Sequence, residues 1–95
     1  MQYDSFRLSL GDSMPPEGLS PALVALWWDA RGDWHQAHDV LREDQNRDCA
    51  WVHAYLHRKE GDPVNAAFWY RRAGQSIPTG SLEEEWEHIA GELVK

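Results

Sequence analysis

The sequence predicts an all-α protein: two antiparallel helical hairpins plus a C-terminal capping helix, preceded by an extended N-terminal leader. Three observations support this fold class. Apolar residues recur at helical spacing in several segments, residues that cap helix N-termini precede these segments, and glycines follow them. A chain of 95 residues corresponds to one domain, which we place at residues 20–95, with residues 1–19 as the leader.

The leader is expected to lie extended on the domain through its apolar residues, or to be partly disordered. Its apolar residues follow no helical period: Tyr3, Phe6, Leu8 and Leu10. Pro15 to Gly18 form a cluster of helix-breaking residues that separates the leader from the first helix.

Five helices are predicted, at about residues 20–31, 33–44, 47–60, 62–73 and 81–94. The first and fourth begin with a capping side chain followed by proline, which loses no hydrogen bond at the first helical position. Gly32, Gly61 and Gly74 end three of the helices, and we expect Gly61 to have a positive φ. Ser81 and Glu84 are spaced as a capping box at the start of the last helix.

The two hairpins repeat a short pattern. Residues 32–37 (GDWHQA) align with residues 61–66 (GDPVNA), and an alanine stands twelve positions before the last residue of each segment. Tyr70, Ala73 and Pro78 follow the second segment. Over about residues 20–79 this pattern resembles the tetratricopeptide repeat, which implies that the first helix of each hairpin lines a concave surface. The strings WVHAYLHRKEGD and WYRRAG also resemble short bacterial proteins of unassigned function, a resemblance that implies no activity.

The charge of the chain is unevenly distributed. The net charge is −7, yet residues 47–73 carry five basic and three acidic residues. The acidic total argues against nucleic acid as a partner. The local positive charge favours an acidic peptide or a small anion, unless these are only solvated charges at helix ends.

A partner-binding surface is the main functional expectation. Trp51, Tyr55 and Arg58 fall on one face of the third helix, and the resemblance places this face on the concave surface. With Lys59, Arg71 or Arg72 they would bind an acidic or carboxylate-bearing segment of another protein. The alternative is that the third helix is packed on both sides, so that Trp51 and Tyr55 belong to the core.

Metal binding is the second hypothesis. His53, His57 and Glu60 are spaced one turn apart on the third helix, opposite the aromatic face, which is a metal-ligand spacing. The alternative is a pair of histidines hydrogen-bonded at a helix seam. Because only three ligands align, we expect no stoichiometric zinc and no cofactor. His35, His38 and Asp39 form a second, looser group on the second helix.

The remaining function classes have less support. No Gly-rich phosphate loop and no Gly-x-Ser-x-Gly motif occurs, so we expect no enzyme. Two alternatives stay open: a small-anion or metal-binding protein, or an enzyme, that uses His and Arg residues of the third and fourth helices, and a structural homodimer joined through Trp-rich faces. A lone cysteine, no signal-peptide pattern and no apolar run of membrane-spanning length predict a cytoplasmic protein with no membrane partner.

Overall fold

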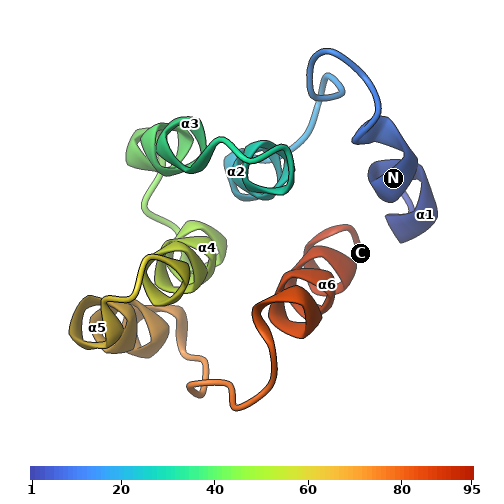
Figure 1. The fold of residues 1–95 in the computed structure, drawn as a ribbon. Helices are drawn as coiled ribbons and strands as arrows, with labels where there is room; N and C mark the ends of the chain where they lie inside the picture. The colour runs from blue at the N-terminus through green and yellow to red at the C-terminus, as the bar shows by residue number, and fades with distance from the viewer.

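A computed structural model describes residues 1–95, apart from the side chain of Glu43, and all of its regular secondary structure is helical (Figure 1). In chain order the elements are α1 (Tyr3–Ser9), α2 (Pro21–Ala30), α3 (Trp34–Val40), the 3₁₀ helix η1 (Leu41–Glu43), α4 (Arg47–Lys59), α5 (Pro63–Ala73) and α6 (Leu82–Leu93). No strand occurs in the described chain, which confirms the predicted all-α class. None of these helices combines the length and apolar character needed to cross a bilayer.

The five predicted helices form, with N-terminal caps that satisfy backbone donors. In each case the cap side chain accepts a hydrogen bond from the backbone N–H three residues later. The caps are Ser20, Asp33, Asn46, Asp62 and Ser81. The predicted capping box of Ser81 and Glu84 is present. The second helix ends at Val40 rather than near Asp44, because the chain tightens there into η1.

The N-terminal segment corrects one prediction, since α1 is a helix rather than part of an extended leader. Phe6 is buried and stacks on Trp86 of α6, with ring centroids 5.9 Å apart. The indole N–H of Trp27 in α2 donates to the backbone oxygen of Ser9 at 3.2 Å. The apolar residues of this segment showed no helical period because they include Leu8. This side chain is 80% exposed and does not belong to the buried face of α1.

The two turns that join α2 to α3 and α4 to α5 have the same geometry. Gly32 and Gly61 have φ of 82° and 88°, which confirms the positive φ expected at Gly61. After each glycine an aspartate N–H donates back across the turn, from Asp33 to the Trp28 carbonyl at 2.9 Å and from Asp62 to the His57 carbonyl at 3.0 Å. These bonds are those of a Schellman helix end. The chain therefore forms two antiparallel hairpins, α2–α3 and α4–α5.

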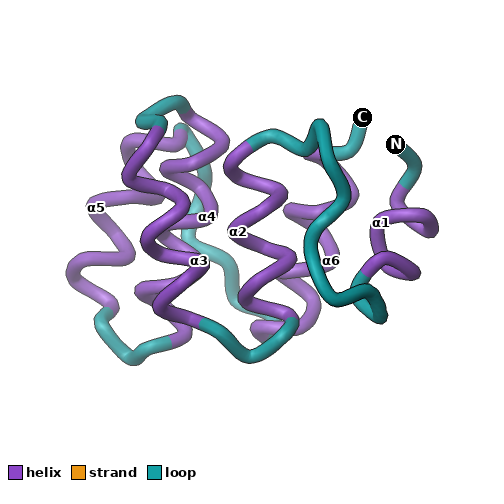
Figure 2. The backbone as a smooth tube through the Cα atoms, turned by 90° about the horizontal axis from the view of Figure 1, so that it is seen from above, coloured by secondary structure: helices purple, strands orange, loops and turns teal.

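The hairpins are arranged so that α2 and α4 face α6. Figure 2 shows the helices in succession from α5 at one end to α1 at the other. Helix α6 contacts both α2 and α4, while α3 and α5 pack on the outer side (Figure 1). The indole N–H of Trp86 donates to the Leu26 carbonyl at 3.0 Å, which joins α6 to α2. The C-terminal helix therefore occupies the inner face of the two hairpins.

We expect Gly61→Val to destabilise the fold by about 1–2 kcal/mol, because a β-branched residue is strained at positive φ. A thermal or denaturant melt measures this loss. Gly91→Ala is the matched control: Gly91 lies in α6 without a positive φ, and nothing lies within 4 Å of an added Cβ. That substitution should raise stability by about 0.5–1 kcal/mol. An unchanged melt for Gly61→Val would contradict the assigned turn.

Candidate functional site

The predicted contact face of α4 is covered by the protein's own helix α6. Trp51 is 8% exposed and Tyr55 is 2% exposed. The Trp51 ring meets His88 of α6 edge-on, with ring centroids 5.6 Å apart. The expectation that these two aromatic side chains are open to a partner is therefore wrong, and the alternative that they belong to the core is confirmed. The physical reason is that α6 fills the space in which a partner was expected.

The charge at this face is also satisfied within the chain. The Arg58 guanidinium donates to Glu85 Oε1 at 2.9 Å and to the Gly80 carbonyl. The Tyr70 hydroxyl donates to the second oxygen of the same Glu85 carboxylate. Arg58 thus binds a carboxylate, as expected, but that carboxylate belongs to α6.

A second buried carboxylate lies beside the first. Asp29 of α2 is buried and accepts hydrogen bonds from the Tyr55 hydroxyl at 3.0 Å and from Lys59 Nζ at 2.9 Å. Burial, followed by the charge of Asp29, raises the pKa of Tyr55 far above its ordinary value. Burial and the hydrogen bond to Glu85 do the same to the pKa of Tyr70. Both hydroxyls therefore remain protonated donors.

The other two predicted contact residues, Arg71 and Arg72, are exposed on α5. Helices α5 and α6 lie beside α4 in different directions (Figure 1), and the side of α5 that carries the two arginines is exposed. The structure therefore does not bring the predicted contact residues together into one surface. A role for Arg71 and Arg72 in binding a partner stays a prediction.

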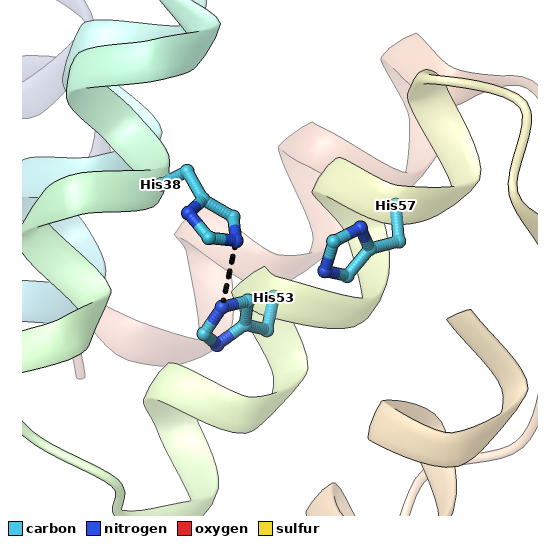
Figure 3. A group of neighbouring side chains, drawn as sticks. All are labelled: His38, His53 and His57. Atoms are coloured by element: carbon cyan, nitrogen blue, oxygen red, sulfur yellow. Dashed lines mark hydrogen bonds between the residues drawn. The ribbon is translucent and has the colours of Figure 1, made fainter. Parts of the chain in front are cut away.

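The opposite face of α4 carries a cluster of three histidines, His38 of α3 with His53 and His57 of α4 (Figure 3). One ring nitrogen from each lies within 4.8 Å of the other two. His53 and His57 are buried, and His38 is half-buried. We call these three residues the histidine cluster.

Two tryptophans hold the rings of the histidine cluster in place. Trp34 of α3 stacks on His38, with centroids 5.1 Å apart and planes 16° from parallel. Trp69 of α5 stacks on His53, with centroids 4.1 Å apart and planes 12° from parallel. The Trp34 indole N–H donates to the Leu56 carbonyl of α4 at 2.9 Å. Because α3 and α5 each supply one tryptophan, the cluster is enclosed on both sides.

Hydrogen bonds orient two ends of the cluster. His38 Nε2 and His53 Nε2 face each other at 3.2 Å. His57 Nδ1 lies 2.7 Å from Glu60 Oε1, and Asn65 Nδ2 lies 3.4 Å from His57 Nε2. A neutral His57 that donates from Nδ1 to the carboxylate keeps the lone pair on Nε2, where Asn65 can donate to it.

Burial favours the neutral form of His53 and of His38. Burial lowers the pKa of His53 to about 4, and the charges of His38 and His57 add to the effect. Burial also lowers the pKa of His38, followed by the charge of His57. Neutral imidazoles have a lone pair that can bind a metal ion.

The sequence predicted part of this site. The pairing of His53 with His57 is confirmed as a shared face, but Glu60 does not act as the third member, because its carboxylate holds His57 Nδ1. His38 takes that place, although the sequence grouped it with His35 and Asp39, which are exposed. The available signal was that His38 belongs to the inner stripe of its helix, and inner stripes face neighbouring helices.

Cys49 lies outside the histidine cluster. Its side chain is buried, and burial, followed by the charge of Asp44, raises the pKa of the thiol to about 11. The thiol is therefore protonated at neutral pH and is a poor metal ligand, since the thiolate is the ligating form.

Comparison with known proteins supplies no relative. No protein-family model matches the chain, and neither the curated proteins nor the solved structures contain a match.

The metal-free protein should lose stability between pH 6.5 and pH 4. In this window the unfolded chain protonates His53 at its ordinary pKa of about 6.5, while the folded protein does not until about pH 4. The expected loss for this residue is about 3 kcal/mol, complete near pH 4 and absent above pH 6.5. Denaturant melts in the presence of a chelator measure it.

The variant His53→Phe keeps an aromatic ring against Trp69 but cannot titrate. Its stability should therefore depend less on pH between 6.5 and 4 than that of the wild type. His35→Phe is the control. Because His35 is exposed, this substitution should leave the slope of unfolding free energy against pH as it is in the wild type. If the wild type and His53→Phe have the same slope of unfolding free energy against pH, His53 is not held neutral by the fold.

Arg58→Ala should lower stability by about 1–3 kcal/mol, because it leaves the buried Glu85 carboxylate without its cation. Arg71→Ala removes the same side chain from an exposed position and should change stability by no more than about 0.5 kcal/mol. Melts of the two variants compare these effects directly. If Arg58→Ala melts like Arg71→Ala, the Arg58–Glu85 contact does not hold α6 in place.

Proposed function

We propose that this protein binds a divalent transition-metal ion of the zinc class through His38, His53 and His57. The observation that supports this most strongly is the convergence of three ring nitrogens, from two helices, to within 4.8 Å. Imidazole nitrogen is a preferred ligand for zinc, copper and nickel. This proposal replaces the earlier expectation of no zinc, which counted only ligands along one helix.

The spacing of the cluster is close to what a metal requires. With Zn–N bonds of about 2.0–2.1 Å, two ligand nitrogens of a tetrahedral site lie about 3.3–3.4 Å apart. His38 Nε2 and His53 Nε2 are already 3.2 Å apart. His57, whose ring nitrogen lies within 4.8 Å of the other two, would approach by up to about 1.5 Å, exchanging the long contact with Asn65 for a bond to the ion.

The surroundings match those of metal-ligating histidines. Such residues usually donate the second ring N–H to a carboxylate, which fixes the tautomer and increases the basicity of the ligand nitrogen. Glu60 stands in this position at 2.7 Å from His57 Nδ1. The stacked Trp34 and Trp69 limit rotation of the other two rings.

A bound ion would join the two hairpins. His38 belongs to the first hairpin, and His53 and His57 belong to the second. Three histidines leave one coordination position for water or another ligand. Because its ligands come from both hairpins, the ion would fasten α3 to α4, and its open fourth position is one that catalytic rather than purely structural zinc sites keep.

We further propose that the hairpins are of the tetratricopeptide kind. The identical turns at Gly32 and Gly61 support this, as do the four alanines buried between the paired helices: Ala25, Ala37, Ala54 and Ala66. Small residues allow paired helices to approach closely. The position of α6 inside the two hairpins distinguishes this chain from an array with an open groove.

Metal-free protein titrated with zinc should bind one equivalent in a calorimeter. Because the ion binds the folded state, the free energy of unfolding should rise by about 2.7 kcal/mol at a free zinc concentration one hundred times the Kd. The melting temperature should rise with it. The variant His38→Ala and the double variant His53→Ala, His57→Ala should lose the binding and the shift. His35→Ala, on the same helix as His38 but exposed, should keep both.

Cobalt(II) provides an independent measurement, since its visible absorption reports tetrahedral nitrogen coordination. Wild type and His35→Ala should show the same spectrum, and His38→Ala should lose it. The proposal is contradicted if zinc fails to bind, or if the histidine-cluster variants bind it as well as the wild type does.

A further inference from the structure

The outward face of α5 carries large apolar side chains that nothing in the chain covers. Val64 is 82% exposed and Phe68 is 48% exposed. They are one turn apart and share one side of the helix, opposite the buried Ala66 and Tyr70. Together they form a small contiguous apolar patch, and contiguous apolar patches are what mark contact sites on protein surfaces.

Two arginines extend this face toward the end of the helix. Arg71 and Arg72 are exposed, and neither forms an ion pair with any side chain that the structure describes. The Arg72 guanidinium lies over the rings of Phe68 and Trp69, 5.9 Å and 5.5 Å from their centroids. The C-terminal end of a helix favours cations, but this does not explain the exposed apolar side chains beside them.

The same arrangement of side chains occurs on α4, where the chain's own helix α6 covers it. On α4, Trp51, Tyr55 and Arg58 stand at positions i, i+4 and i+7, and α6 covers them. On α5, Val64, Phe68 and Arg71 stand at the same three spacings and are uncovered. The two faces therefore offer apolar surface and a guanidinium in the same relative positions.

The occupant of the α4 face shows what such a surface accepts. Helix α6 is an acidic amphipathic helix: its apolar side chains face the core, and Glu85 binds Arg58. Its remaining acids lie on the exposed side, among them Glu83 and Glu87. A carboxylate on a helix docked against α5 would accept hydrogen bonds from the guanidinium of Arg71 or Arg72, as Glu85 does from Arg58.

We infer that the face of α5 formed by Val64, Phe68, Arg71 and Arg72 docks an acidic amphipathic helix of a partner protein. The apolar stripe of that helix covers Val64 and Phe68, and its carboxylates bind the two arginines. The exposed cations of Arg71 and Arg72 beside Val64 and Phe68 favour an acidic helix as the occupant of this face. This inference is independent of the metal site.

The test uses a fluorescently labelled synthetic peptide with the sequence of residues 81–95, which is an acidic amphipathic helix of the required kind. The probe is titrated with the full chain, and anisotropy reports binding. The double variant Arg71→Ala, Arg72→Ala should weaken binding about ten- to hundredfold, as expected for lost charged hydrogen bonds. Phe68→Ala should weaken it as well, and added salt should reduce the contribution of the arginines.

Two controls test whether binding depends on these particular arginines and on the charge of the peptide. Arg42→Ala removes an exposed arginine from η1 and should bind like the wild type. A peptide in which every glutamate is replaced by glutamine should bind the wild type as weakly as the acidic peptide binds the double variant. All the protein variants should melt near the wild-type temperature, because the substituted side chains are exposed or half-exposed.

Four outcomes would overturn the inference. The peptide fails to bind, or it binds the double variant as well as the wild type. Loss of binding only in Arg58→Ala would place the peptide in the position of α6 instead. A dimer in light scattering that the double variant abolishes would make a second copy the occupant of this face.

Discussion

Helix α4 has two opposite faces that must both be buried, and the rest of the structure depends on this constraint. Its residues from Cys49 to His57 are all buried. The aromatic face requires a cover that brings a carboxylate to Arg58, which α6 supplies through Glu85. The histidine face requires aromatic neighbours, which α3 and α5 supply through Trp34 and Trp69. Neither hairpin alone covers both faces, so the burial of α4 requires both hairpins and α6.

Polar groups, rather than apolar surface alone, determine how these helices fit together. Within the described side chains, every buried nitrogen and oxygen has a hydrogen-bond partner. Asp29 and Glu85 each receive a tyrosine hydroxyl and a cation. A different position of α6 would leave buried charges without partners, at a cost of several kcal/mol. This network explains why a face expected to bind a separate protein binds a segment of its own chain.

The candidate metal site shows where prediction from sequence stops. His53 and His57 were recognisable as a pair because both lie on one helix, where spacing determines which side chains share a face. His38 comes from another helix, and its approach depends on the packing of α3 against α4. The role of Glu60 depends on which imidazole nitrogen it reaches, and that is a matter of side-chain geometry. Spacing along the chain contains neither kind of information.

The sequence by itself determined the helical class, the order of five helices, the caps of four of them, and the turns at Gly32 and Gly61. These features depend on hydrogen bonds and backbone angles within a few residues. Only the tertiary structure decided that residues 3–9 form a helix, since Phe6 and Ser9 are held by Trp86 and Trp27. It also decided which side of α4 meets α6 and that three histidines converge. These outcomes depend on contacts between residues distant in the chain, and their energies depend on the final packing rather than on local pattern.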